Sequence, residues 1–221
     1  MSRIIDRTFI LTLLVLTAFA NGGCKKKQPE LILEGKVRSS HTGSALSGVA
    51  ILLEQKLVEG QVFSGGFNTA GSTNSGSDGM YEITWERQNI AELQVTAEKS
   101  NYISTTIGLN PDDFNAQEAV VKNISLQPEA FVQTRLVNIE PGEVSDQIRF
   151  RFNTEGYNCN CCENTWREIT GADSDSTFTC TLYGNTWIRY RVEINTSESN
   201  ILILDSIWCP AFQTTPLLIE Y

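Results

Sequence analysis

The chain has 221 residues, with 17 Lys and Arg against 26 Asp and Glu, and a formal net charge of -9. Its hydrophobic content of 41% suits a packed core and argues against a disordered chain. The acidic balance argues against nucleic-acid binding, which needs a basic face. The single histidine, His41, excludes most His-based metal sites and His-paired nucleophiles.

The N-terminal segment has the pattern of a secretory signal. Two arginines precede an almost unbroken apolar run over residues 8–20, which is too short to span a bilayer. Asn21-Gly22-Gly23-Cys24 then resembles a bacterial lipobox, in which the cysteine is lipidated. We therefore expect a lipoprotein signal peptide at residues 1–23, with Cys24 inserting acyl chains into membrane lipid.

Residues 24–30 contain three lysines and a proline and are interpreted as a polar tether. An alternative cleavage site is Ala18-Phe19-Ala20, an A-x-A sequence. Cleavage there would release a soluble secreted protein that begins at Asn21.

Residues 31–128 predict short strands, because apolar and polar residues alternate between clusters of Gly, Asn and Ser. The expected strands lie at residues 31–37, 49–53, 81–85, 93–97, 102–109 and 119–126. Residues 65–79 hold five glycines among Ser, Thr and Asn, which indicates a long flexible loop or a frayed hairpin.

Four short motifs of this segment occur in a recognisable order: Gly35-Lys36-Val37, the stretch 41–49, Ser77-Asp78-Gly79-Met80-Tyr81, and the stretch 97–102. Together they resemble the carboxypeptidase regulatory-like domain family. The sequence departs from the family pattern at Ala45, where proline is usual, and at Asn101, where glycine is usual. The resemblance implies a transthyretin-like β-sandwich that serves folding and recognition rather than catalysis.

Residues 129–221 predict a second sandwich. Apolar residues of 148–152 alternate with Arg149 and Arg151, and those of 188–194 alternate with Arg189 and Arg191. Further strands are expected at 177–182, 201–209 and 217–221. About seven short strands would suit an immunoglobulin-like or fibronectin-like sandwich. The expected fold class is therefore all-β, with two β-sandwich domains.

Five cysteines lie in this second segment: Cys159, Cys161, Cys162, Cys180 and Cys209. Disulfides are expected because an exported chain meets an oxidising compartment. Five cysteines allow at most two bridges and one free thiol. We expect Cys180 and Cys209 each to bridge to the cluster at 159–162, with partners that spacing leaves open. The alternatives are free buried thiols or a Cys₄ zinc site, although C-x-C-C differs from the usual C-x₂-C spacing and no metal is expected.

The four tryptophans raise the question of carbohydrate binding. Trp85 is in phase with Tyr81 and Ile83, so we place it in the core. Trp187 is out of phase with its apolar neighbours and is expected to be exposed. Trp166, near the cysteine cluster, and Trp187 are the candidate glycan contacts.

The chain lacks a recognisable catalytic constellation and a cofactor motif. The leading hypothesis is a non-enzymatic lipoprotein, anchored through Cys24 in the bacterial cell envelope, that binds or assembles with an envelope protein or a glycan. The alternative is a glycan-binding accessory protein. A third hypothesis, an enzyme with Cys159, Cys161 or Cys162 as nucleophile, lacks a second histidine for activation.

Overall fold

The computed structural model describes residues 29–59, 62–63, 65–115, 118–139, 143–157, 159, 161–162 and 164–221. The expected signal peptide 1–23, Cys24 and tether residues 24–28 lie outside these ranges. Across the described residues nearly every regular element is a strand, and the one helical element is a 3₁₀ turn, η1, Pro111–Asp113. The predicted all-β class is confirmed. None of the described helical structure is long and apolar enough to cross a membrane.

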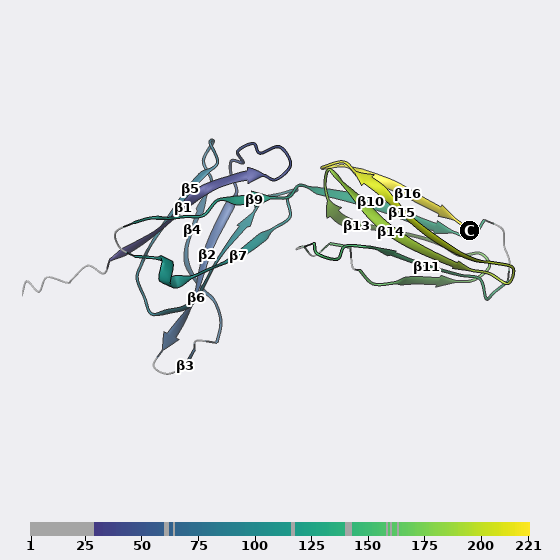
Figure 1. The fold of residues 1–221 in the computed structure, drawn as a ribbon, viewed down its shortest axis with the longest axis horizontal. Helices are drawn as coiled ribbons and strands as arrows, with labels where there is room; N and C mark the ends of the chain where they lie inside the picture. Colours follow the sequence, from purple (N-terminus) through teal and green to yellow (C-terminus); the bar gives the residue numbers. More distant parts are fainter. Residues whose placement is uncertain are drawn as a thin grey trace, which may run out of the picture.

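Two hydrophobic cores lie end to end along the molecule (Figure 1). In the first sandwich, one sheet has the order β5-β1-β8, with β9 also pairing β1. The facing sheet has the order β3-β2-β6-β7, with β4 pairing β2. Alternate side chains of both sheets fill the core, where Leu33, Leu53 and Val95 are fully buried. The bounds are β1 Glu30–Ser39, β2 Ala50–Glu59, β3 Val62–Phe63, β4 Asn68–Asn74, β5 Met80–Glu86, β6 Ile90–Glu98, β7 Thr105–Leu109, β8 Val120–Val121 and β9 Ile124–Leu126.

Strand β4 corrects the expectation of a long flexible loop or a frayed hairpin at residues 65–79, because β4 pairs with β2 and the following strand β5 belongs to the other sheet. Its composition is polar and rich in small residues, which is why it carries little strand propensity of its own. It forms because it pairs antiparallel with β2 over six residue pairs, from Ala50↔Asn74 to Gln55↔Asn68. Tertiary pairing therefore decides the conformation of this segment.

Three of the resemblance motifs meet at one corner of the first sandwich. Val37 N donates to Gly79 O at 2.9 Å, and Leu46 N donates to Val37 O at 3.0 Å. Gly79 has a φ of 79°, and a Cβ atom there would lie 2.6 Å from Val37 O. Asn101 adopts a φ of 66°, a conformation that asparagine tolerates better than most residues. Asparagine thus meets the same backbone requirement as the usual glycine.

The second sandwich contains seven strands in the part of the chain that the structure describes, the number expected. Its sheets have the orders β13-β10-β16 and β12-β11-β14-β15. Phe150 lies at the centre of the core, with ring centroids 4.9 Å from Phe152 and 5.9 Å from Tyr190. Strands β10 and β12 were not among the predicted elements. The bounds are β10 Glu129–Val137, β11 Gln147–Phe152, β12 Arg167–Thr170, β13 Asp175–Tyr183, β14 Thr186–Asn195, β15 Asn200–Cys209 and β16 Thr214–Glu220.

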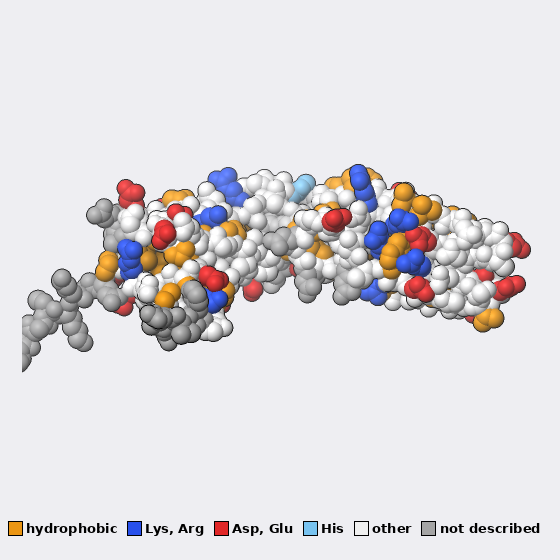
Figure 2. Space-filling view, turned by 60° about the horizontal axis from the view of Figure 1, so that its bottom comes forward, with side chains coloured by type: hydrophobic (Ala, Val, Ile, Leu, Met, Phe, Trp, Pro, Cys, Tyr) orange, Lys and Arg blue, Asp and Glu red, His pale blue; other side chains and the backbone are white. Residues whose placement is uncertain are grey.

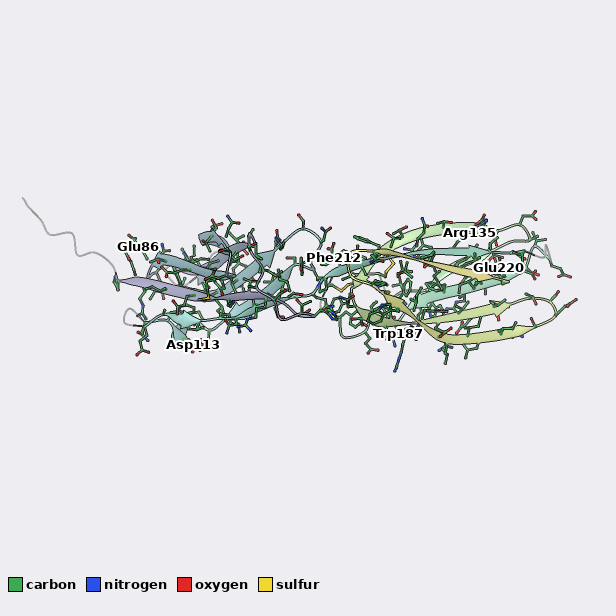
Figure 3. All side chains as sticks on the ribbon, turned by 90° about the horizontal axis from the view of Figure 1, so that it is seen from above. Glu86, Asp113, Arg135, Trp187, Phe212 and Glu220 are labelled. Atoms are coloured by element: carbon green, nitrogen blue, oxygen red, sulfur yellow. A yellow bond between two sulfur atoms is a disulfide. The ribbon has the colours of Figure 1, made fainter. Side chains whose placement is uncertain are left out.

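The two sandwiches are joined closely. Strand β9 ends at Leu126 and β10 begins at Glu129, so two residues connect them. Gln127 Nε2 donates to Gly184 O at 2.9 Å, which links the connection to the second sandwich. The ring of Tyr102 contacts that of Phe212 with centroids 5.4 Å apart, at the junction visible in Figure 3. These contacts restrict bending between the two halves.

The close approach of β1 to the segment joining β8 and β9 gives a stability prediction. A Cβ atom on Gly35 would lie 2.0 Å from Lys122 O, which is backbone and cannot move aside. We expect Gly35→Ala to lower the free energy of unfolding by about 1–3 kcal/mol in a urea titration. Gly108→Ala is the matched control, because no atom lies within 4 Å of its Cβ position and Gly108 also lies in a strand. Equal stability of the two variants would contradict the strand arrangement.

Candidate functional site

The outer face of the sheet β12-β11-β14-β15 gathers arginines and tryptophans. Strand β11 buries Phe150 in the core, and strand β14 buries Val192. Because side chains alternate along a strand, the neighbours of these residues on each strand point outward. Figure 2 shows Lys or Arg side chains grouped beside hydrophobic ones on the C-terminal half. We call this surface the arginine–tryptophan face and define it by Arg149, Arg151, Trp166, Trp187, Arg189, Arg191 and Trp208.

Strand register brings the arginines together. Arg151 stands directly opposite Arg191, and Arg149 stands opposite Glu193. Glu193 forms ion pairs with Arg149 at 2.9 Å and with Arg191 at 2.6 Å. Arg149 also lies 3.6 Å from a carboxylate oxygen of Glu168. The face therefore combines a short ion-pair network with a pair of like charges.

Trp166 lies at the centre of three guanidinium groups. The Cζ atoms of Arg149, Arg151 and Arg191 lie 4.5, 4.7 and 5.5 Å from its ring centroid. Attraction between each cation and the ring's electron-rich face offsets part of their mutual repulsion. The Nε atoms of Arg149 and Arg191 are buried and lack a hydrogen-bond partner. The ring of Trp166 is therefore occupied by the chain's own arginines.

Trp187 and Trp208 form a separate, open aromatic pair. Trp187 is 62% exposed, as its phase predicts, and its ring centroid lies 5.7 Å from that of Trp208. Figure 3 shows Trp187 on the side of the sandwich opposite Arg135. Among the ring contacts of the described residues, none joins Trp166 to this pair. The two candidate glycan contacts thus lie on one face but do not form one continuous platform.

A hollow of about 530 Å³ lies on this face. The three arginines of its lining point to this side of the sheet, whereas Tyr190 and Asp205 alternate with them and point to the core side. The Asp205 carboxylate accepts hydrogen bonds from Ser206 N at 2.7 Å and from the Tyr190 hydroxyl at 3.3 Å. Burial and then the charge of Asp205 raise the pKa of Tyr190, so its hydroxyl stays protonated and donates. The lining residues are Arg151, Asn153, Arg189, Tyr190, Arg191, Leu204, Asp205 and Ser206.

A second hollow, of about 720 Å³, includes Glu143, Asp146, Glu198 and Glu220 in its lining. Asp146 is buried and its Oδ1 atom lacks a hydrogen-bond partner. The described residues contain no cluster of three or more His, Cys, Asp or Glu side chains placed to hold a metal ion.

The cysteines correct one expectation. Disulfides join Cys162 to Cys180 and Cys159 to Cys161, and Cys209 is a free, buried thiol. The prediction that Cys209 bridges to the cluster is wrong, because its position at the end of β15 buries it completely in the second core. The two bridges leave one of the five thiols for metal binding, which excludes the Cys₄ zinc alternative.

Comparison with known proteins gives no family assignment. No family model matches the chain, and no curated protein matches it either. The solved structures that match this chain include a streptococcal ancillary pilin, at 12% identity and a TM-score of 0.33, covering 87% of this chain and 62% of that one. The shaft pilin SpaA of Lactobacillus rhamnosus GG follows at 10% identity and a TM-score of 0.30, covering 87% and 97%.

A third structure is a Bacteroides uniformis protein provisionally assigned to carbohydrate binding, at 10% identity and a TM-score of 0.28, covering 80% and 98%. The chain spans 62% and 34% of the length of the first two structures found, the ancillary pilin and the Bacillus anthracis TIE protein. At TM-scores this low, the likeness assigns neither a family nor a function to this chain.

The free thiol gives a reactivity prediction. Burial raises the pKa of Cys209 to about 11, so at pH 8 the folded chain holds almost no thiolate to react. We expect iodoacetamide to leave Cys209 unmodified in the native Cys24→Ser chain, and to modify one thiol per chain once guanidinium unfolds it without reductant. Intact mass measures both states. Modification of the native chain at the unfolded rate would contradict the burial of Cys209.

Proposed function

We propose that this chain is a non-catalytic binding module of the bacterial cell envelope, anchored by lipid on Cys24, which binds an envelope protein or glycan through the arginine–tryptophan face. The observation that carries the proposal is this face itself. It places Arg151, Arg189 and exposed Trp187 on one regular sheet, where the rigid strands hold their positions. Arginine and tryptophan are the side chains that most often dominate binding energy at interfaces.

The rest of the architecture supports a binding role. The short, hydrogen-bonded connection at Gln127 and Pro128 restricts movement of the second sandwich relative to the first. We place the domain boundary here, between domains 31–128 and 129–221, with residues 24–30 as the tether. A face at the far sandwich would then stand away from the membrane that holds Cys24.

We also assign the first sandwich to the carboxypeptidase regulatory-like family. Support comes from the corner where Val37, Leu46 and Gly79 contact one another, because the motif residues meet there in space. The positive φ of Asn101 adds to it, since the family pattern has glycine at that position. A domain of this kind would hold the second sandwich in position for binding and would have no catalytic role.

Glycan binding is the second candidate function. The open pair Trp187 and Trp208 favours it, because flat aromatic side chains with a polar edge suit surfaces that are half apolar and half wet. Trp166 was expected to contact a glycan directly, but arginines cover its ring. Its role would be to position those arginines.

Photo-crosslinking in intact host cells tests the binding module. A p-benzoylphenylalanine residue replaces Trp187 in one chain and Gln133, exposed on the opposite sheet, in the control. We expect a crosslink to an envelope component from position 187 but not from position 133. The Cys24→Ser version should leave the membrane fraction and lose most of that crosslink. Identical products from both positions, or none from position 187, would contradict the proposal.

A further inference from the structure

The arginine–tryptophan face carries positive charge that the chain does not neutralise. Arg149 and Arg191 share Glu193, whereas the described residues place no carboxylate within ion-pair distance of Arg151 or Arg189. Arg151 also stands directly opposite Arg191, and like charges in that position destabilise a sheet. Such a cluster is unexpected on a chain of net charge -9. An anionic ligand would relieve the repulsion.

The hollow on this face has the chemistry to hold such an anion. Arg151, Arg189 and Arg191 line it together, and guanidinium groups bind carboxylate and sulfate through paired hydrogen bonds. Asn153 and Ser206 add neutral hydrogen-bonding groups. Asp205 is the one acidic residue of the lining, but it alternates with Ser206 along β15, so its carboxylate lies on the core side and accepts a hydrogen bond from the Tyr190 hydroxyl.

The aromatic pair points to the kind of molecule that carries the anion. Trp187 lies two residues before Arg189 on the same face of β14, a separation of roughly 7 Å along a strand. A sugar ring could therefore rest on Trp187 while its charged neighbour reaches the hollow. An acidic peptide would satisfy the arginines but would leave the exposed Trp187–Trp208 pair without a matching flat partner.

We propose that the arginine–tryptophan face binds an anionic polysaccharide whose sugars carry carboxylate or sulfate groups. The anionic groups occupy the hollow formed by Arg151, Arg189 and Arg191, and a sugar ring packs on Trp187. This inference rests on the proposed function and specifies its ligand class. Because the attraction is largely electrostatic at an exposed surface, binding should weaken as salt concentration rises.

Binding to immobilised polymers tests the proposal with the Cys24→Ser chain. The probes are polygalacturonate for carboxylate, dextran sulfate for sulfate, neutral dextran and poly-L-glutamate. The Arg151→Gln/Arg189→Gln double variant removes two charges from the hollow. The Arg38→Gln/Arg87→Gln double variant removes two exposed charges from the first sandwich and is the control. Urea unfolding curves verify that the variants fold equally well.

We expect binding to polygalacturonate, dextran sulfate or both, weakened at least about tenfold by Arg151→Gln/Arg189→Gln and unchanged in the control. Trp187→Ala should weaken polysaccharide binding by a similar factor. Poly-L-glutamate bound as tightly, without dependence on Trp187, would overturn the proposal in favour of an acidic protein partner. Neutral dextran bound independently of the arginines would overturn it in favour of a neutral glycan.

The two proposals fail in distinguishable ways. Absence of binding to every polymer, with the crosslink from position 187 retained in cells, would overturn the anionic polysaccharide but leave the binding module intact. Polyanion binding that survives in the Arg151→Gln/Arg189→Gln variant would place the ligand elsewhere on the chain and overturn the assigned site.

Discussion

The alternation of buried and exposed residues along β11 and β14 is the constraint on which the candidate site depends. Phe150 and Val192 face the second core, where Phe150 packs against the rings of Phe152 and Tyr190. Their burial forces Arg149, Arg151, Arg189 and Arg191 onto the opposite side of the same strands. Packing thus holds the arginines side by side although their charges repel.

Trp166 offsets part of the repulsion between these arginines. Its ring lies against three guanidinium groups, and Glu193 forms ion pairs with two of them. Arg151 and Arg189, which have no carboxylate within ion-pair distance among the described residues, line the hollow. Neighbouring like charges on a sheet lower the stability of the fold, so stability alone does not account for these unpaired arginines. An anion bound in the hollow would neutralise them.

Much of the fold follows from the sequence because alternation is a local signal. Strands β5, β11 and β14 were predicted from it, and so were the burial of Trp85 and the exposure of Trp187. Strand β4 was missed because its partner β2, and not its own composition, makes it a strand. Strand β12 is only four residues long and carries no repeated alternation.

The site was harder to predict than the strands. The alternating arginines are visible in the sequence, but residues 149–151 and 189–191 are separated by forty positions, and only the register of β11 with β14 brings them together. The wrong partner for Cys209 has a similar cause, since spacing does not reveal that β15 carries this thiol into the core. The contacts of Trp166 with arginines were also not predictable from the sequence, because Arg149 and Arg191 come from different strands.

The indole N–H signals of the four tryptophans report most directly whether an anionic polysaccharide binds the arginine–tryptophan face. A ¹H–¹⁵N spectrum of the Cys24→Ser chain would be recorded during separate titrations with oligogalacturonate and a sulfated dextran oligomer. If an anionic polysaccharide binds the arginine–tryptophan face, at least one titration shifts the signals of Trp166, Trp187 and Trp208, while Trp85, buried in the first core, stays unchanged. Unchanged spectra in both titrations, or shifts confined to Trp85, would contradict it.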